Sequence, residues 1–233
     1  MNTNVILNED FLLNNLPNES IDLIVTDPPY KTITGGKNNG KNAKRPKGIL
    51  FGNDKLFEHQ KLEISDWMPQ LYRILKEDTH CYIFTNTINM EKMLTESRKV
   101  GFKLHNILTW QKNNCTPSQY YMKNCEYILF LRKGKAKWIN DIGGSKTVHE
   151  YLIEDNPVTI AVNNIIGNKV HPTEKPVGLL EFYISNSSNE GDIVLDPFAG
   201  SGSTLKASKN LNRQYIGYEI DEEYIKVINK NLE

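Results

Sequence analysis

The sequence contains no apolar run of the roughly 18–20 residues that a membrane-spanning helix needs. Its first residues also lack the basic start and the long apolar stretch of a secretion signal. Cysteine is scarce: three residues, an odd number with no C-x-x-C pair, argue against both a disulfide framework and a zinc site. These absences predict a reduced, cytoplasmic protein that uses no metal.

An excess of charge of either sign is also missing, because 28 Lys and Arg residues face 28 Asp and Glu residues. Net charge therefore cannot identify a polyanionic partner, and any basic surface must be local. Two segments are locally basic: residues 31–52 carry six cations and no acid, and residues 103–137 carry seven cations against Glu126 alone. Each segment is either a solvated face or part of a phosphate-binding surface.

The chain of 233 residues is 39% hydrophobic and 24% charged, which suffices for an ordinary soluble core. Short β-rich apolar runs alternate with helical patterns, which is typical of a mostly parallel sheet covered by helices. The predicted strands are Asn4–Asn8, Ile21–Thr26, Thr79–Thr85, Leu104–Trp110, Glu126–Leu131, Asp192–Asp196 and Gln214–Tyr218. The predicted helices are Ser65–Leu75 with Ser65 as its N-cap, Ile88–Val100, Val177–Ser188, Ser203–Asn210 and Asp221–Leu232.

The first motif with chemical content is DPPY, residues 27–30, which directly follows a predicted strand. Open α/β sheets bind ligands at the carboxyl ends of their strands. Pro28 and Pro29 stiffen the turn and leave the Pro28 carbonyl without a competing local donor. The carboxylate of Asp27, this carbonyl and the ring of Tyr30 would form a rigid surface, called the ledge below. Such a ledge suits a planar base with an exocyclic amino group. A proline-rich surface turn is the alternative interpretation.

The second motif is DPFAGSGST, residues 196–204, which leads from a strand through a glycine-containing turn into a helix. Glycine lets a ligand approach the backbone closely, and the helix N-terminus offers unpaired N–H groups. About twenty residues further on, a strand ends at Glu219, where an acid commonly holds ribose hydroxyls. This layout predicts a nucleoside-binding half of a Rossmann-like fold, although G-x-G alone is a weak signal. The spacing does not fit a P-loop.

Together the two motifs resemble those of the amino-group DNA methyltransferases that use S-adenosylmethionine. Their order, with the catalytic motif before the cofactor motif, resembles the β class of that family. The resemblance extends over nearly the whole chain, and HPTEKP at residues 171–176 adds to its specificity. Segments 67–76, 80–86, 107–114, 124–135, 171–181 and 213–224 resemble the remaining blocks of the family.

The resemblance implies one catalytic domain over residues 1–233 with a Rossmann-like α/β fold. Its sheet is expected to have seven strands, mostly parallel with one antiparallel strand, and helices on both faces. A short target-recognition insert is expected within about 111–170. The N-terminal strand Asn4–Asn8 is expected beside Gln214–Tyr218, and Leu104–Trp110 with Glu126–Leu131 should form the terminal pair that includes the antiparallel strand.

The resemblance also implies catalytic roles for Asp27, Pro28, Pro29 and Tyr30. Asp27 and the Pro28 carbonyl would accept hydrogen bonds from the target amino group, while Tyr30 stacks on a base flipped out of the duplex. Such hydrogen bonds aim the nitrogen lone pair at the methyl group, so that positioning supplies most of the catalysis. No metal and no covalent intermediate are required.

The cofactor implied is S-adenosyl-L-methionine, with S-adenosyl-L-homocysteine as product. Asp10 would contact the adenine, although this chain has Glu9-Asp10 where the family usually has Gly-Asp. The HPTEKP residues would lie at the methionine end. The residues expected to bind the cofactor are Asp10, Asp27, His171, Thr173, Lys175, Asp196, Phe198, Gly200, Ser201, Gly202 and Glu219.

Double-stranded DNA is the expected substrate partner, and a second copy of the chain and a cognate restriction endonuclease are further partners that the resemblance suggests. The basic segment 31–52 is expected to be mobile without DNA, because its glycines include Gly35, Gly36, Gly40 and Gly48. Amide side chains near residue 113 could read adenine edges or be ordinary loop polars. The residues expected to contact DNA are Lys41, Lys44, Arg45, Lys47, Lys112, Asn113 and Asn114.

The family's DPPY motif usually accompanies methylation of the 6-amino group of adenine, so this substrate is favoured over the 4-amino group of cytosine. Two other hypotheses remain. An RNA or protein glutamine methyltransferase would have a related ledge, but its cofactor motif normally precedes the ledge. A non-catalytic nucleic-acid-binding subunit is disfavoured because DPPY and FAGSG are both intact.

Overall fold

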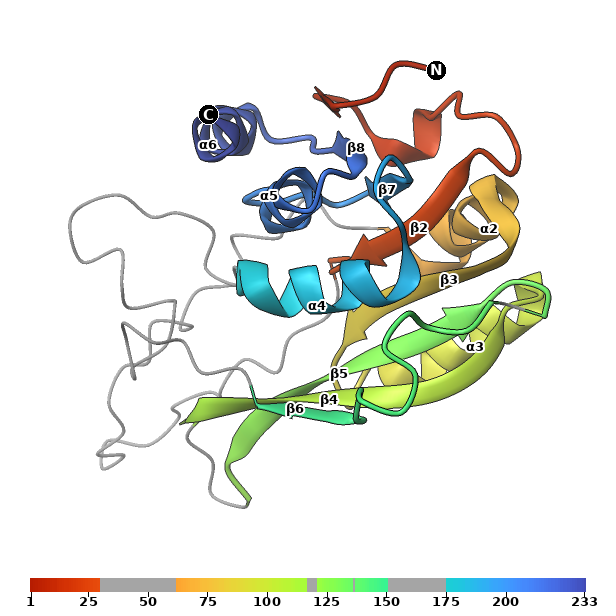
Figure 1. The fold of residues 1–233 in the computed structure, drawn as a ribbon, viewed down its shortest axis with the longest axis vertical. Coiled ribbons are helices and arrows are strands. Elements are labelled where there is room, and N and C mark those ends of the chain that lie inside the picture. The colour runs from red at the N-terminus through yellow and green to blue at the C-terminus, as the bar shows by residue number, and fades with distance from the viewer. Residues whose placement is uncertain (30–61, 117–120, 136, 151–174) are drawn as a thin grey trace, which may run out of the picture.

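A mixed sheet of eight strands forms the centre of the protein in the computed structural model, which describes residues 1–29, 62–116, 121–135, 137–150 and 175–233 (Figure 1). The spatial order of the strands is β1-β8-β7-β2-β3-β5-β4-β6. The strands are β1 Val5–Leu7, β2 Ile21–Thr26, β3 Leu75–Thr85, β4 Lys103–Thr116, β5 Lys123–Arg132, β6 Val148–Glu150, β7 Ile193–Asp196 and β8 Gln214–Tyr218.

The predicted topology is confirmed apart from the strand count. β1 pairs in parallel with β8, with Val5 opposite Ile216, so the N-terminus supplies the strand beside β8. β5 is antiparallel to both of its neighbours, and the other neighbouring strands are parallel. The expected count of seven was wrong, because β6 adds an eighth strand outside β4. Since β6 is the three-residue sequence VHE, it carries no alternating apolar pattern, and the β4–β5 pair is not terminal.

The central strand β2 is apolar because helices cover the sheet on both sides. Ile24 packs into the core on one face, while Leu23 and Val25 pack into the core on the other, and all three are fully buried. β2 lies between β7 and β3. The carboxyl ends of β2 and β7 therefore lie side by side, although their sequences are far apart.

The helices form two layers (Figure 1). On one face, the 3₁₀ turn η1, α2 and α3 cover the cluster that contains Ile24. On the other face, α4 and α5 cover the cluster that contains Leu23, and α6 packs against α5. Within the described residues no helix is both long and apolar enough to cross a bilayer. The elements are η1 Phe11–Leu13, α2 Ile64–Ile74, α3 Met90–Val100, α4 Val177–Ser187, α5 Ser203–Asn210 and α6 Glu222–Leu232.

The start of α2 differs from the prediction that Ser65 is its N-cap. The helix begins at Ile64, and Glu63 occupies the cap position. The Asp66 carboxylate accepts a hydrogen bond from the Glu63 N–H at 3.1 Å, as the third residue of a capping box does. The end of α3 agrees with the sequence: Gly101 has a φ of 111°, and its N–H caps the last turn.

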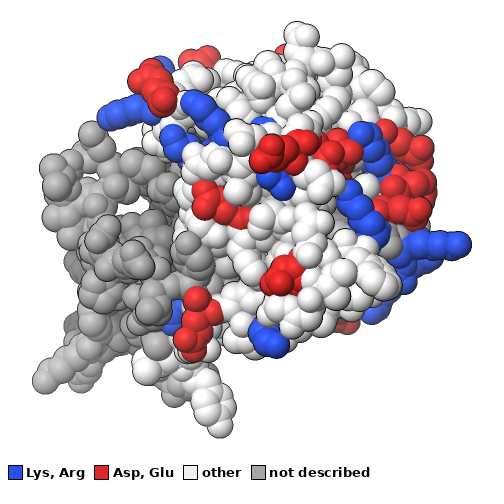
Figure 2. All heavy atoms as spheres, viewed as in Figure 1, with Lys and Arg blue, Asp and Glu red and all other residues white. Residues whose placement is uncertain are grey.

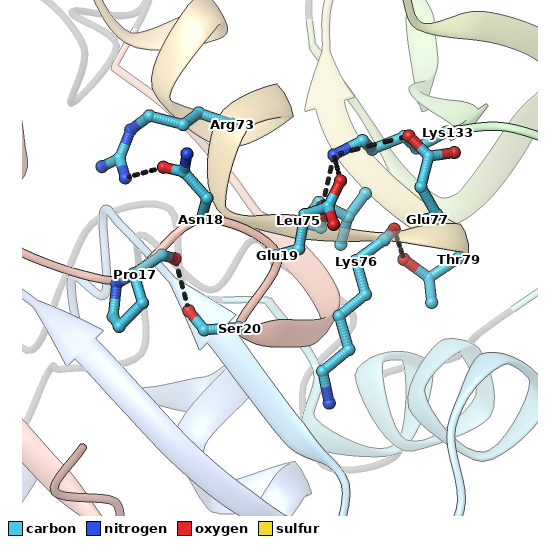
Figure 3. Close-up of polar contacts among 10 residues, drawn as sticks. All are labelled: Pro17, Asn18, Glu19, Ser20, Arg73, Leu75, Lys76, Glu77, Thr79 and Lys133. Carbon is cyan, nitrogen blue, oxygen red and sulfur yellow. Dashed lines mark hydrogen bonds and ion pairs between the residues drawn. The ribbon is translucent and has the colours of Figure 1, made fainter.

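A polar clasp of Arg73 and Lys133 joins several elements at the amino ends of β2 and β3 (Figure 3). The Lys133 ammonium, which is 4% exposed, donates to the Leu75 carbonyl at 2.8 Å and to Glu19 at 3.1 Å. It also lies 4.8 Å from the centre of the Tyr72 ring. Arg73 donates to the Leu16 carbonyl at 2.7 Å. These contacts tie the segment before β2 to the β3 and β5 ends.

We expect Lys133→Met to destabilise the protein, because the Leu75 carbonyl and Glu19 lose a charged donor in a largely dry site. Hydrogen bonds of this kind contribute about 1.5–3 kcal/mol. Urea denaturation should therefore show a lower midpoint for Lys133→Met. The control is Lys226→Met, which removes an ion pair with Glu223 on the exposed surface of α6 and should leave the midpoint unchanged. Equal midpoints for the two variants would show that the clasp does not stabilise the fold.

Candidate functional site

The carboxyl edge of the sheet gathers the motifs that the sequence singled out. Asp27 follows β2, Asp196 ends β7 and Glu219 follows β8, while Lys175 precedes α4. Because β5 runs antiparallel, its first residues rather than its last lie at this edge, and Tyr127 pairs with Thr85 at the end of β3. A small pocket opens here, lined by Asp27, Lys175, Leu180, Asp196, Phe198, Ala199, Gly200, Ser201, Ser203 and Thr204.

Asp27 of the ledge is ion-paired with Lys175. The Lys175 ammonium donates to Asp27 Oδ2, lies 3.4 Å from Glu126 Oε2 and lies 5.3 Å from the centre of the Phe84 ring. Lys175 is 7% exposed. Burial alone would lower the pKa of Lys175, but the two carboxylates more than offset this and hold the pKa above its usual value. Lys175 therefore stays protonated beside Asp27 at neutral pH.

Glu126 is a functional candidate that the sequence interpretation did not select. It lies between two ammonium groups, at 2.6 Å from Lys112 Nζ and 3.4 Å from Lys175 Nζ. Burial alone would raise the pKa of Glu126, but Lys175 and Lys112 lower it below the usual range. One signal could have found this residue: it is the only acid in the basic segment 103–137, at the start of a strand that reaches the site.

Asp196 is a second buried carboxylate, next to Asp27 at the end of the adjacent strand. Its Oδ1 accepts hydrogen bonds from the Thr26 hydroxyl at 2.8 Å and from the Phe198 N–H at 3.1 Å. Burial raises the pKa of Asp196 to about 6, and the negative charge of Asp27 adds to the shift. Through its hydrogen bond with the Phe198 N–H, Asp196 thus fixes the start of the segment that leads into the glycine turn.

Glu219 closes the other side of the glycine turn. Its Oε2 accepts from the Gly200 N–H and its Oε1 from the Asp221 N–H, both at 2.9 Å. Burial raises the pKa of Glu219. Gly200 has a φ of 53° and Gly202 a φ of 85°, so both adopt left-handed backbone. A Cβ on Gly202 would also lie 2.8 Å from the Ile228 side chain, which gives this glycine a packing role.

Aromatic rings support the pocket on the side of β1. Phe198 packs edge-to-face against Phe11 at 6.1 Å and against Trp67 at 5.7 Å between ring centres. Asp10 precedes Phe11 at the end of β1, and its Oδ1 accepts from the Leu12 N–H at 2.9 Å. Asp10 therefore caps η1, whatever else it binds. Ser201 is buried within the turn and its carbonyl accepts from the Asn231 side chain at 3.1 Å.

Several predicted site residues lie outside the described part of the chain. Pro28 and Pro29 are described, buried and half-buried respectively, at the point where β2 ends. Within the described ranges, no three His, Cys, Asp or Glu side chains gather as metal ligands would. The residues that cannot be placed are Tyr30, Lys41, Lys44, Arg45, Lys47, His171 and Thr173, together with the side chains of Asn113 and Asn114.

The basic segment 103–137 does not lie on one side of the molecule. Lys112 is near the site and pairs with Glu126, whereas Lys133 belongs to the clasp at the opposite edge of the sheet. On the face drawn in Figure 2, positive and negative side chains of the described residues are interspersed and form no continuous basic area. Lys112 and Lys133 of this segment thus make internal contacts at opposite edges of the sheet.

Comparison with known proteins identifies the family. Residues 21–230 match the family model of the N6/N4 methyltransferases, described as DNA methylase. The chain belongs to the N6/N4 DNA methylase family. The identity of this N6/N4 DNA methylase with curated relatives extends over nearly its whole length, which confirms the family that the motifs resemble.

Two curated type II methyltransferases illustrate the similarity. The N6/N4 DNA methylase described here is 33% identical to M2.DpnII of Streptococcus pneumoniae over 236 aligned residues, which cover 95% of this chain and 85% of the relative. It is 31% identical to M.HinfI of Haemophilus influenzae, with 98% of this chain and 68% of the relative covered.

Solved structures agree with the fold. The crystal structure of an M1.HpyAVI–SAM complex has a TM-score of 0.68 at 26% identity, covering 97% of this chain and 98% of that one. The PvuII methyltransferase, which is cytosine-N4-specific, has a TM-score of 0.71 at 20% identity, covering 98% of this chain and 86% of that one. The second likeness shows the fold alone. The predicted Rossmann-like class is therefore confirmed for this N6/N4 DNA methylase.

Asp196 provides a test of the electrostatics of the site. Its folded-state pKa of about 6 exceeds the usual 3.8, so the folded state binds the proton more tightly and loses stability as pH rises between these values. Two pKa units correspond to about 3 kcal/mol. We expect Asp196→Asn to remove this part of the pH dependence.

The measurement is the free energy of unfolding in urea at pH values below and above this window, for the wild type and for Asp196→Asn. The difference between the two proteins isolates Asp196 from other groups that titrate in the same range. An identical pH dependence in both proteins would show that the pKa of Asp196 is not raised in the folded state.

Proposed function

We propose that this protein transfers the methyl group of S-adenosyl-L-methionine to the 6-amino group of adenine in double-stranded DNA. The observation that carries the proposal is the position of Asp27 and Pro28, at the carboxyl end of the central strand and beside the glycine turn of residues 200–202. Membership of the N6/N4 family supports the chemistry, and the aspartate in the ledge supports adenine over cytosine.

The residues of the pocket fit the cofactor. Glu219 already accepts two backbone N–H groups, but a carboxylate has about four acceptor positions, so it can also accept from ribose hydroxyls. The turn at Gly200 lets the backbone approach a nucleoside, and Phe198 offers an aromatic surface held by two other rings. When bound, S-adenosyl-L-methionine supplies an electrophilic methyl group.

Asp27 and the Pro28 carbonyl bind the target amino group. An aromatic amine is a poor nucleophile, because its lone pair is delocalised into the ring. When both N–H groups donate to these two oxygens, the nitrogen can pyramidalise and direct its lone pair away from them. Most of the rate then comes from holding the reactants in line. For each methyl group gained, the nitrogen gives up one proton.

The base reaches this edge by leaving the duplex, with Tyr30 as its stacking partner. We propose that Lys41, Lys44, Arg45 and Lys47 contact phosphates near the flipped base, and that the region within 111–170 reads the target sequence. The names of the relatives, type II methyltransferases, support a role beside a cognate restriction endonuclease. A second copy of the chain remains a further partner to test.

The direct test is modification-sensitive sequencing of DNA from a host that expresses the chain, compared with a host that expresses the Asp27→Ala variant. The proposal requires N6-methyladenine in a defined sequence context that appears only with the wild-type chain. Methylation of the cytosine 4-amino group instead would replace the substrate. Modification of RNA or protein alone, measured with tritiated cofactor, would refute the proposal.

We expect Asp27→Ala to lower the turnover of duplex DNA by about a hundredfold or more, the loss that follows removal of one positioned group at a reacting centre. Cofactor affinity should change much less, because the glycine turn and Glu219 remain. Turnover is measured by radiolabel transfer and affinity by calorimetry. Glu223→Ala, which removes an exposed carboxylate on α6, is the control. Near wild-type turnover in Asp27→Ala would contradict the mechanism at its centre.

We expect Glu219→Ala to weaken cofactor binding by about tenfold to a hundredfold, because a hydrogen bond to a charged group contributes about 1.5–3 kcal/mol. The Gly200 N–H also loses its acceptor, which loosens the turn. Calorimetry should show normal affinity in the control Glu222→Ala, which removes a carboxylate in the first turn of α6. Unchanged affinity in a folded Glu219→Ala protein would remove Glu219 from the site.

A further inference from the structure

We propose that Glu126 is a positioning residue for methyl transfer, which holds the Lys175 ammonium between two carboxylates and thereby fixes Asp27 for the target amino group. This inference deepens the proposed function and rests on it. Glu126 belongs to neither of the two motifs. It acts through Lys175 and need not contact the base or the cofactor.

The geometry spans three neighbouring strands. Asp27 follows β2 and Glu126 lies near the start of β5, with β3 between them. Lys175 reaches over this middle strand on the face that α4 covers, and its ammonium lies 5.3 Å from the ring of Phe84 in β3. One ammonium thus joins carboxylates from both sides of β3, at Asp27 Oδ2 and at 3.4 Å from Glu126 Oε2.

The charges alternate in sign along this path: Asp27, Lys175, Glu126 and Lys112. The outer ammonium of Lys112 lies 2.6 Å from Glu126 and 5.3 Å from the centre of the Trp110 ring. Asp196 at the end of β7 is the further acid that acts on Asp27. Each inner group, Lys175 and Glu126, has opposite charges on both sides. These neighbours raise the pKa of Lys175 and lower that of Glu126, which favours the charged forms although Lys175 is almost fully buried.

Because Glu126 shares the Lys175 ammonium, Asp27 keeps more of its negative charge for accepting hydrogen bonds from the target amino group. A carboxylate that holds an ammonium alone is largely neutralised and accepts further hydrogen bonds weakly, since charge-assisted bonds depend on the net charge of the acceptor. Glu126 draws part of that charge away. Glu126 also fixes the position of the Lys175 side chain. The lysine stem is flexible, so one carboxylate alone does not determine where its ammonium lies. Without Glu126, we expect Asp27 alone to hold the Lys175 ammonium, so that the ammonium and the Asp27 oxygens leave the positions that they have in the wild type.

The test compares Glu126→Gln with the wild type in three measurements: kcat on duplex DNA, the dissociation constants for cofactor and DNA, and the crystal structure of the free protein. We expect kcat to fall about tenfold to a hundredfold, as small misplacements at a reacting centre do. Both dissociation constants should change much less than kcat, and the Lys175 ammonium should be displaced. The matched control is Glu223→Gln, which removes the carboxylate of an exposed ion pair on α6.

Glu126→Asp keeps the charge and so protects the fold, but it shortens the reach to Lys175 by one methylene. If Glu126→Gln does not fold, Glu126→Asp should still lower kcat by more than it changes either dissociation constant. Wild-type kcat in either folded variant would overturn the inference, as would a loss of cofactor affinity equal to the loss of kcat. If the wild-type protein modified no DNA, the proposed function would fall separately, and an undisplaced Lys175 in the crystal would still refute the role of Glu126.

Discussion

The parallel pairing of β2 with β7 is the constraint on which the site depends. Leu23 lies opposite Val194 and Ile24 opposite Leu195, so both strands end at the same level of the sheet. The hydrogen bond from the Thr26 hydroxyl to Asp196 locks this register at the edge. This register brings motifs separated by about 170 positions to one pocket. A slip of one residue would turn every side chain of the strand to the opposite face and would separate the motifs.

The sequence predicted the elements whose side chains report burial directly. β2 and β8 have the predicted bounds, and the N-terminal strand was found because a Rossmann-like sheet needs a neighbour for β8. Two features that the sequence did not predict, β6 and the contact of Glu126 with Lys175, depend on tertiary contacts. β6 is short and polar, and it becomes a strand only because β4 offers an unpaired edge. Glu126 lies beside Lys175 only because β5 runs antiparallel to its neighbours. The sequence marks Glu126 as the one acid of segment 103–137, but it does not pair Glu126 with Lys175.

Four carboxylates at one edge of the sheet have different properties because their surroundings differ. Asp27 and Glu126 share the charge of Lys175, and the pKa of Glu126 is held low. Asp196 has hydrogen-bond donors but no ion pair with a cation of the described part of the chain, and burial raises its pKa to about 6. Glu219 is held by two backbone N–H groups. In the proposed function, Asp27 meets the target amino group, Glu126 positions Lys175, Asp196 supports the glycine turn and Glu219 accepts from ribose hydroxyls. The surroundings of each group thus assign different roles to the same functional group.

Part of the balance between positive and negative charges in the chain is explained by internal ion pairs. Within the described residues, several cations are committed to internal partners: Lys112 to Glu126, Lys175 to Asp27 and Lys133 to the opposite edge. Cations used in this way contribute little field to the outside, because each is offset by a neighbouring acid. A protein that must hold a polyanion then needs cations without acidic neighbours. Residues 31–52 contain six cations and no acid and follow DPPY directly in the sequence, and for this reason the proposed function assigns phosphate contacts to them.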